Sequence, residues 1–337
     1  MLQRKNNDCG IAISSRIRLA RNISEFPFPS RMNNEQGNEA IERVRNVILS
    51  SEKFEEDEFK YIDLKKLDFI DKQVLAEEHL ISPELASSGN AGVFINKGKN
   101  MSIMINEEDH LRIQNIYSGI NLDKAWDGCF RTSIEFEKNI DFAFNRRYGY
   151  LTSCPTNTGT GLRASVLLHL PALTMTGYIK GTFEICNKLG LAVRGLYGEH
   201  SEALGNMYQV SNQATLGQTE EEIIKSVNNI INSIIEQEKT LRNQIYNQNK
   251  LRFEDRIFRS LGVFKNARII SLEESLKNIS DIRLGVDMGI IKDIKPQKIN
   301  NIIILIQPAN LQKNAGTELG FEERDIKRAE IIRQEFK

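Results

Sequence analysis

The stretch LTSCPTNTGTGLRASV, from Leu151 to Val166, places a cysteine, a loop rich in threonine and glycine, and an arginine close together in the chain. Backbone N–H groups in a glycine-rich loop can cradle phosphate oxygens, and a guanidinium binds phosphate through paired N–H groups. A thiol beside such groups raises the question of which reaction uses all three. The stretch therefore predicts a loop that binds a reacting substrate.

The same stretch holds Gly159, Gly161 and Ala164 at the G-x-G-x-x-A spacing of the dinucleotide fingerprint, between a segment that we expect to be a strand and one that we expect to be helical. In that fingerprint the first glycine follows the strand directly, whereas Cys-Pro-Thr-Asn-Thr intervenes here. The sequence contains no G-x-x-x-x-G-K-[ST], H-R-D or D-F-G motif. If the protein is a kinase, it belongs to neither common type.

Three further arginines lie in IAISSRIRLAR, which we interpret as a strand. Alternation along a strand divides it into two faces, with Ser14, Arg16 and Arg18 on one, and Ile13, Ser15, Ile17 and Leu19 on the other. Two guanidiniums on one face suit a polyphosphate. Taken alone, the pattern also fits an exposed basic strand.

Three consecutive acids, Glu107, Glu108 and Asp109, follow the alternating strand SIMIN and precede Arg112. A carboxylate at such a position can bind a cationic substrate and remove its proton, although acids after a strand often only solvate a turn. The glycine-bounded stretch RGLYGEHSEALG adds Arg194 and Glu199, with the same two interpretations.

The composition is that of an ordinary globular protein. The 337 residues are 40% hydrophobic, and 45 Lys and Arg balance 45 Asp and Glu, so no net charge attracts nucleic acid or an anionic membrane. The cysteines Cys9, Cys129, Cys154 and Cys186 form no CxxC pair, which argues against a disulfide framework or structural zinc. With no secretory signal and no apolar span of membrane length, we expect a cytoplasmic protein that binds neither nucleic acid nor membrane.

The chain divides into two patterns. Up to about residue 215, strand-like runs such as NMSIMIN and YGYLTSC alternate with helical patterns such as EAIERVRNVIL. Helix dominates afterwards: TEEEIIKSVNNIINSIIEQEKTL begins with a capping box from Thr219 to Glu222 and repeats apolar residues at helical spacing. We expect a boundary near residue 247, between a region from 1 to 247 and a helical region from 248 to 337.

Four motifs in this order, SSRIRLAR, NEEDHLRI, CPTNTGTGLRAS and RGLYGEHSEA, resemble the phosphagen (guanidino) kinases, which include arginine and creatine kinases. The resemblance covers roughly residues 11 to 247. Those kinases also carry a helical N-terminal domain, missing here, and a histidine where GVFIN has Ile95. The helical extension from 248 is similar to that of the bacterial protein-arginine kinases, a branch of the same family. The resemblance implies an α+β fold, a large and mainly antiparallel sheet flanked by helices, followed by a helical C-terminal domain.

The activity implied by the resemblance is transfer of the γ-phosphoryl group of ATP to a guanidinium, with Mg²⁺ carried by the nucleotide. Glu108 is the implied base, Glu199 its partner on the other edge of the guanidinium, and Cys154 a thiolate beside the substrate's charge. Glu107 and Asp109 would reach Mg²⁺ through water. The implied ATP and phosphate contacts are Ser14, Ser15, Arg16, Ile17, Arg18, His79, Arg112, Arg163, Ala164, Ser165, Val166, Leu167, Arg194, Gly195, Leu196, Tyr197, Gly198 and Glu199.

The missing N-terminal domain would leave the site open, which favours arginine residues within proteins as the substrate. Free arginine is the alternative, and a catalytically silent adaptor that binds phosphorylated proteins is a third hypothesis. The resemblance also implies protein substrates with exposed arginines, an activator protein, a Clp-type protease and a homodimer.

The C-terminal stretch ERDIKRAEIIR resembles a phosphoarginine-reading motif formed by Arg324, Asp325, Arg328 and Ala329. Arg324 and Arg328 lie one helical turn apart, where two guanidiniums can share a phosphate while Asp325 holds the ligand's guanidinium. The same charge pattern also suits a solvated surface helix.

Overall fold

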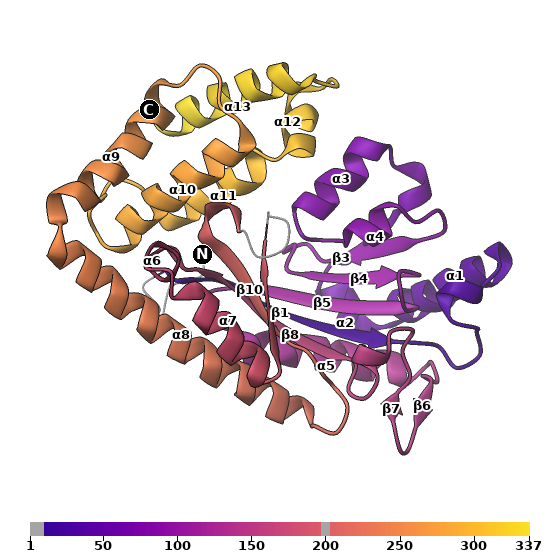
Figure 1. The fold of residues 1–337 in the computed structure, drawn as a ribbon. Helices are drawn as coiled ribbons and strands as arrows, with labels where there is room; N and C mark the ends of the chain where they lie inside the picture. Colours follow the sequence, from indigo (N-terminus) through magenta and orange to yellow (C-terminus); the bar gives the residue numbers. More distant parts are fainter. Residues whose placement is uncertain (1–9, 197–202) are drawn as a thin grey trace. The chain divides into compact units, whose positions relative to one another are not determined.

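The computed structural model describes residues 10–196 and 203–337 (Figure 1). The chain divides into two compact units. One, here called the sheet unit, comprises Ser14–Ser165 and Ser211–Asn228. The other, here called the helical unit, comprises residues 10–13, 166–196, 203–210 and 229–337 of the described chain. The boundary expected near residue 247 stays a prediction, because these units describe how the chain is packed and not where its domains begin and end.

The main sheet is eight-stranded in the described residues, with the order β2-β3-β4-β5-β1-β8-β10-β9. Its strands are β1 (Ala12–Arg21), β2 (Lys60–Asp63), β3 (Gly92–Ile95), β4 (Met101–Ile105), β5 (Leu111–Ser118), β8 (Leu162–His169), β9 (Leu191–Gly195) and β10 (Met207–Asn212). The pairs β1–β5, β2–β3, β3–β4 and β4–β5 are all antiparallel. A separate small hairpin consists of β6 (Phe144–Asn145) and β7 (Gly149–Tyr150). The mainly antiparallel α+β fold is thus confirmed.

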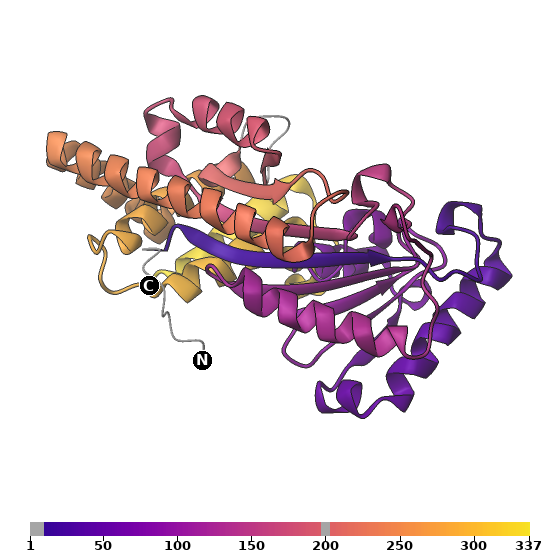
Figure 2. The same ribbon diagram turned by 90° about the horizontal axis from the view of Figure 1, so that it is seen from below.

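Helices α1 (Asn34–Ser50) and α5 (Leu122–Glu137) cover one face of the sheet unit's strands (Figure 2). The apolar spacing predicted α1, whose buried residues Ala40, Ile41, Val44, Val47 and Ile48 lie along one stripe. The short helices α2 (Glu52–Glu56), α3 (Phe69–Glu77) and α4 (Pro83–Ala86) complete this part of the chain. A small core that includes Leu64, Leu85, Val93 and Ile95 lies between β3 and the segments around it.

The helical unit is built from α6 (Pro171–Met175), α7 (Ile179–Lys188), most of α8 (Glu220–Gln248), α9 (Lys250–Asn266), α10 (Leu272–Asp287), α11 (Pro296–Leu305), α12 (Pro308–Ala315) and α13 (Phe321–Glu335). Its core includes Phe253, Phe264, Leu276, Ile282 and Ile332. The capping box predicted at the start of α8 is present, since Thr219 N donates to Glu222 and Glu222 N donates to the Thr219 hydroxyl.

Two local expectations were wrong. YGYLTSC forms only the short strand β7, because Leu151 to Cys154 leave the ladder and turn into the glycine-rich loop. The segment after that loop is strand β8 and not a helix. The alternate residues Leu162, Ala164, Val166 and Leu168 are all fully buried, which is the two-residue period of a strand.

Candidate active site

Strand pairing brings three arginines to one face of the sheet unit. Opposite residues of an antiparallel pair point to the same side, and the register aligns Arg18 with Gln114 and Ala20 with Arg112. Arg16, Arg18 and Arg112 therefore share a face, with Arg18 and Arg112 diagonal to each other. The opposite face of β1 carries Ile17 and Leu19, which are fully buried, as the alternation predicted.

The arginines lower one another's pKa values. Burial and the charges of Arg112 and Arg163 lower the pKa of Arg16 to about 10. Burial and the same neighbours, with Arg16, hold the pKa of Arg18 well below its usual value, and Glu107 opposes the shift only in part. The Nε atom of Arg18 is buried without a hydrogen-bond partner. Like charges gathered in this way create a positive site for a polyanion.

A cavity of about 100 Å³ is lined by Arg18 and Arg112, by the acid Glu108 and by the glycine-rich loop. The structure thus brings together five residues predicted from separate motifs: Arg18, Glu108, Arg112, Cys154 and Arg163. The same cavity is lined by Gly161, which stands in the G-x-G-x-x-A spacing, and by Ala20, Thr156 and Asn157, which the sequence patterns did not single out. The sequence feature that could have identified these three residues is their position: Ala20 lies in SSRIRLAR, and Thr156 and Asn157 lie in CPTNTGTGLRAS.

The three acids have different surroundings. Glu107 pairs with Arg112 and accepts from the Ser82 hydroxyl at 2.6 Å. Asp109 is buried and accepts from the amide of Asn22 at 2.6 Å and from the backbone N–H of Ser153 at 2.7 Å. These bonds to residues distant in the sequence hold the turn that carries Glu108.

Glu108 is the acid that remains accessible, with 43% of its side chain exposed, although one oxygen lies 3.4 Å from Arg112. Burial and the charges of Asp109 and Glu107 raise the pKa of Glu108 against the opposing charge of Arg112. A carboxylate with a raised pKa, at the wall of a cationic cavity, is suited to accept a proton.

The glycine-rich loop follows a 3₁₀ turn, Pro155–Asn157. The sulfur of Cys154 is half-buried and lies 3.0 Å from the Thr156 hydroxyl. Gly161 has φ +67, and a Cβ there would lie 2.6 Å from the Ala20 carbonyl oxygen, so a side chain is excluded where the loop joins β8. Arg163, the next predicted residue, donates to the Ser211 hydroxyl at 3.3 Å.

Several predicted nucleotide contacts are built into the sheet. The Ser15 hydroxyl donates to the Gly119 carbonyl and accepts from the Asn121 N–H, and the Ser165 hydroxyl donates to the Arg16 carbonyl. The side chains of Ile17, Ala164 and Val166 are fully buried, while Ser14 and Leu167 are half-buried. His79 lies close enough to Arg16 that burial and this charge lower its pKa to about 4. Ile95 lies buried in β3.

The remaining predicted residues lie elsewhere. Arg194 is exposed on β9 in the helical unit, Gly195 ends that strand, and Leu196 is half-buried against the helical core. Tyr197, Gly198 and Glu199 lie outside the described residues.

The C-terminal motif lies on α13. Arg328 is buried and donates to the carbonyls of Ile306 at 3.0 Å and Ile270 at 3.1 Å, and it also pairs with Asp325. Arg324 lies over the ring of Phe321, 4.6 Å from its centroid, and Phe321 is 85% exposed. Ala329 is buried. Arg328 thus connects parts of the helical core, whereas Arg324 and Asp325 are half-exposed.

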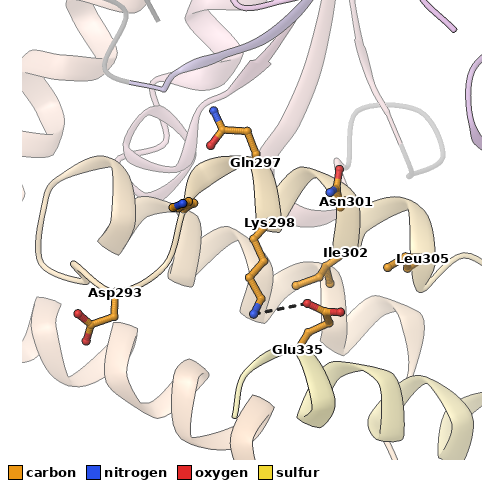
Figure 3. A pocket seen from close by; sticks show the side chains of 8 residues that line it. Asp293, Gln297, Lys298, Asn301, Ile302, Leu305 and Glu335 are labelled. Carbon is orange, nitrogen blue, oxygen red and sulfur yellow. Dashed lines mark ion pairs between the residues drawn. The ribbon is translucent and has the colours of Figure 1, made fainter. Parts of the chain in front are cut away.

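Figure 3 shows a second cavity, of about 390 Å³, within the helical unit. Lys298 crosses it to pair with Glu335 at 3.4 Å, and Asn301, Ile302 and Leu305 of α11 line its wall. The residues predicted from the motifs do not line this cavity. Among the described helices, we find none with the length and apolar character needed to span a membrane.

Two protein-family models together match most of the chain. Residues 39–241 match the model of the ATP:guanido phosphotransferase C-terminal catalytic domain, and residues 250–337 match the model of the protein-arginine kinase McsB C-terminal domain. The chain belongs to the ATP:guanido phosphotransferase family. Glu108, Arg112, Cys154 and Arg163 of the cavity lie in the matched catalytic region, whereas Arg18 and Ala20 precede it. The family's use of ATP therefore applies to this chain.

The chain is also similar to curated proteins and solved structures. It is 46% identical to the protein-arginine kinase of Caldanaerobacter subterraneus subsp. tengcongensis, over 96% of each chain, and 44% identical to that of Bacillus subtilis, over 99% of this chain and 92% of that one. Lombricine kinase has a TM-score of 0.62 and 27% identity, over 72% of this chain and 70% of that one. The duplicated taurocyamine kinase from Schistosoma mansoni, with bound transition state analog components, has a TM-score of 0.62 and 29% identity, over 74% of this chain and 35% of that one.

Proposed function

We propose that this chain is a protein-arginine kinase that transfers the γ-phosphoryl group of ATP to arginine residues in proteins. The observation that carries the proposal is the cavity in which Glu108, Cys154 and the arginines Arg18, Arg112 and Arg163 meet. Relatives named protein-arginine kinase, matched over nearly the whole chain, support protein arginine over free arginine as the acceptor.

The reaction needs an oriented and partly deprotonated guanidinium. In the proposed step, the carboxylate of Glu108 accepts a proton from an Nη atom of the acceptor arginine as that nitrogen forms a bond to the γ-phosphorus. The bond between the γ-phosphorus and the bridging oxygen breaks, and its electron pair leaves on ADP. Cys154, as a thiolate, would stabilise the acceptor's remaining positive charge. Glu199 would hold the opposite edge of the guanidinium.

The arginines would stabilise the charge that spreads over the transferring phosphoryl oxygens. Arg16, Arg18, Arg112 and Arg163 supply this charge from the sheet unit, and we assign Arg194 to the same task. The adjoining strand residues and His79 would shape the nucleotide site around them. Arg112 pairs with Glu107 and Glu108, and Arg163 donates to the Ser211 hydroxyl, so the protein itself orients these two arginines and limits the reorganisation that accompanies the transfer.

Mg²⁺ would be carried by the nucleotide, where it neutralises phosphate charge. No group of three or more acidic, histidine or cysteine side chains in the described part of the chain could hold a metal ion. Glu107 and Asp109 each keep one buried carboxylate oxygen without a hydrogen-bond partner. This donor set fits a nucleotide-borne ion reached through water and does not fit a protein cage.

The remaining parts of the proposal concern partners. We propose a cytoplasmic homodimer that acts with an activator protein and marks its substrates for a Clp-type protease. We also propose that Arg324, Asp325 and the α13 segment that contains Arg328 and Ala329 bind phosphoarginine. The match of residues 250–337 to the C-terminal domain model supports this assignment.

The test is incubation of the full chain with ATP and Mg²⁺, and with either reduced, carboxymethylated lysozyme or free arginine. The expected product is phosphoarginine in the protein, detected by phosphorus NMR and by its loss in acid. The matched control is the Glu108→Gln variant. Phosphorylation of free arginine alone would support the small-molecule alternative. If neither acceptor is phosphorylated but phosphoarginine peptides bind, the chain is an adaptor.

A further inference from the structure

Arg21 is the third arginine of β1, and the proposed mechanism does not use it. It lies on the face of the strand opposite to Arg16 and Arg18, because it stands three positions after Arg18 and five positions after Arg16 in the alternating pattern. Only 2% of Arg21 is exposed. This guanidinium therefore cannot join the phosphate-binding arginines on the other face of the sheet.

The contacts of Arg21 lead to the glycine-rich loop. Its Nη1 atom donates to the carbonyls of Ala20 at 2.8 Å and Thr160 at 2.9 Å. Its guanidinium carbon lies 3.5 Å from the centroid of the Tyr150 ring. Arg21 thus contacts both the base of the hairpin β6–β7 and the middle of the loop.

The charge of Arg21 is stabilised by an aromatic ring and by two backbone carbonyls. None of the ion pairs found among the described residues includes Arg21, and its Nε atom is buried without a partner. The hydroxyl of Tyr150 donates to Glu137 at 2.8 Å, which makes the ring richer in electrons and a better partner for a cation. Burial lowers the pKa of Arg21, and the nearby Tyr150 and Glu137 oppose this shift.

The loop is held between β7 and β1, on either side of Arg21. Tyr150 N donates to the Gly159 carbonyl at 2.8 Å, and Ala20 N donates to the Gly161 carbonyl at 3.0 Å. A Cβ at Gly161 would lie 2.7 Å from Nη1 of Arg21, so the backbone of the loop passes directly against the guanidinium. On the outer side, Tyr150, Gly159 and Thr160 border an open cleft of about 230 Å³. There the Thr215 hydroxyl donates to the carbonyls of Thr156 and Thr158, so the loop is held from both sides and Arg21 is its charged contact.

We infer that Arg21 is a positioning residue, which holds the Cys154–Arg163 loop so that Cys154 and Arg163 face the phosphoryl-transfer cavity. The inference rests on the proposed function. Displacing reacting groups by about 1 Å lowers a rate by about 10²-fold, and Thr160 lies in the middle of the segment that carries both groups. Lysine carries a compact ammonium group in place of the planar guanidinium, so it can replace only part of the contact with the Tyr150 ring and the Thr160 carbonyl.

The test compares Arg21→Met, Arg21→Lys and Tyr150→Leu with Arg146→Met, which removes an exposed arginine from the tip of the hairpin. We expect Arg21→Met to lower kcat by about 10²-fold with little change in the KM for ATP, because the arginines of the opposite face remain. Arg21→Lys and Tyr150→Leu should fall between this variant and the wild type, and Arg146→Met should match the wild type.

A second measurement does not depend on activity. Cys154 is half-buried in the loop, whereas Cys129 and Cys186 are buried, so the rate at which iodoacetamide alkylates the Cys154 peptide reports the loop's position. We expect severalfold faster alkylation in Arg21→Met than in wild type and Arg146→Met. This result would stand even if the wild type transferred no phosphate, so failure of the proposed function and failure of the inference are distinguishable.

Unchanged kcat and unchanged alkylation in folded Arg21→Met would overturn the inference. If Arg21→Met does not fold, Arg21→Lys decides: a lowered kcat and faster alkylation at an unchanged melting temperature support positioning. A lower melting temperature with wild-type kcat per folded molecule would show a merely structural arginine.

Discussion

Both units contain clustered arginines, but their exposure and neighbours differ: Arg16 and Arg18 of the sheet unit are half-buried, whereas Arg242 and Arg283 of the helical unit are buried. In the sheet unit, Arg16 and Arg18 are surrounded chiefly by other arginines, and their pKa values are lowered. In the helical unit, buried arginines meet carboxylates. Arg242 donates to Glu238 at 2.8 Å and lies 3.6 Å from Asp287, and Arg283 lies 3.6 Å from the same Asp287.

The helical group also satisfies the backbone around it. Glu238 accepts from the N–H groups of Ala172 and Leu173, and Arg242 donates to the His169 carbonyl at 3.0 Å. Burial and the two arginines hold the pKa of His169 well below its usual value, so this imidazole stays neutral at physiological pH. The charges there balance one another and serve the fold.

The comparison shows how arginines that bind a ligand can be distinguished from arginines that stabilise the fold. A buried ion pair is balanced within the protein, so loss of one partner mainly lowers stability. A cluster of like charges is destabilising by itself, and a polyphosphate relieves the repulsion. Clustering, more than burial, therefore distinguishes the arginines that we propose to bind ATP.

The largest expected effect tests the base beside the arginine cluster. Glu108→Gln should lower the rate of phosphoarginine formation by about 10²- to 10⁴-fold, because glutamine keeps the shape of the side chain without its basicity. Binding of a non-hydrolysable ATP analogue, measured by calorimetry, should change little. Turnover near that of the wild type would remove Glu108 from the mechanism.

The next effect concerns stability in the helical unit. Arg242→Met should lower the free energy of unfolding by about 3 to 5 kcal/mol, since it leaves Glu238 and Asp287 with less compensation. Arg259→Met is the control, because its pair with Asp255 is exposed and should contribute less than about 1 kcal/mol. Denaturant titration measures both, and equal effects would contradict the assignment of structural charge.

Arg163→Ala and Arg194→Ala should show the opposite pattern. Each should lower phosphoryl transfer by about 10²- to 10³-fold, because the loss falls on the charged transition state. For Arg163, melting temperature should stay the same or rise, since removal of one cation relieves repulsion on Arg16 and Arg18. If the two variants unfolded at a much lower temperature but kept their rate per folded molecule, Arg163 and Arg194 would be structural residues.

A smaller effect is expected from pH. Because the pKa of Glu108 is raised and its deprotonated form is the active one, kcat should fall as the pH drops through that raised pKa, and the fall should begin at a higher pH than for an ordinary glutamate. A pH–rate profile measured above the acid unfolding transition checks this. A profile that stayed flat down to the pKa of an unperturbed glutamate would argue against Glu108 as the base.

The smallest effect concerns the C-terminal motif. Asp325→Ala and Arg324→Ala should each weaken binding of a phosphoarginine peptide by about tenfold, the loss of one charge-assisted hydrogen bond. Arg328→Ala is less informative, because Arg328 also joins α13 to the Ile270 and Ile306 carbonyls and its loss should lower stability. Peptide affinity equal to that of the wild type in both single variants would make α13 an ordinary surface helix.

The sequence by itself predicted several features that depend on near neighbours in the chain. Alternation separated Arg16 and Arg18 from Ile17 and Leu19, and helical spacing with a capping box predicted α8. The order of the four motifs identified the family before any contact was known. These predictions succeeded because periodicity and capping act within a few residues along the chain. The same local reasoning failed at β8, where alternating buried residues were interpreted as a helix.

Only the tertiary structure decided which residues meet. Pairing of β1 with β5 brings Arg18 beside Arg112, and the loop adds Cys154 to the same cavity. These residues are far apart in the sequence, so the spacing of residues along the chain does not predict that they meet. Ser82 supports Glu107, Arg21 supports Thr160, and Arg328 is buried although its motif resembles a charged surface helix. The reason is physical: a side chain's charge and hydrogen bonds are fixed by what surrounds it in space, and that depends on the packing of distant segments.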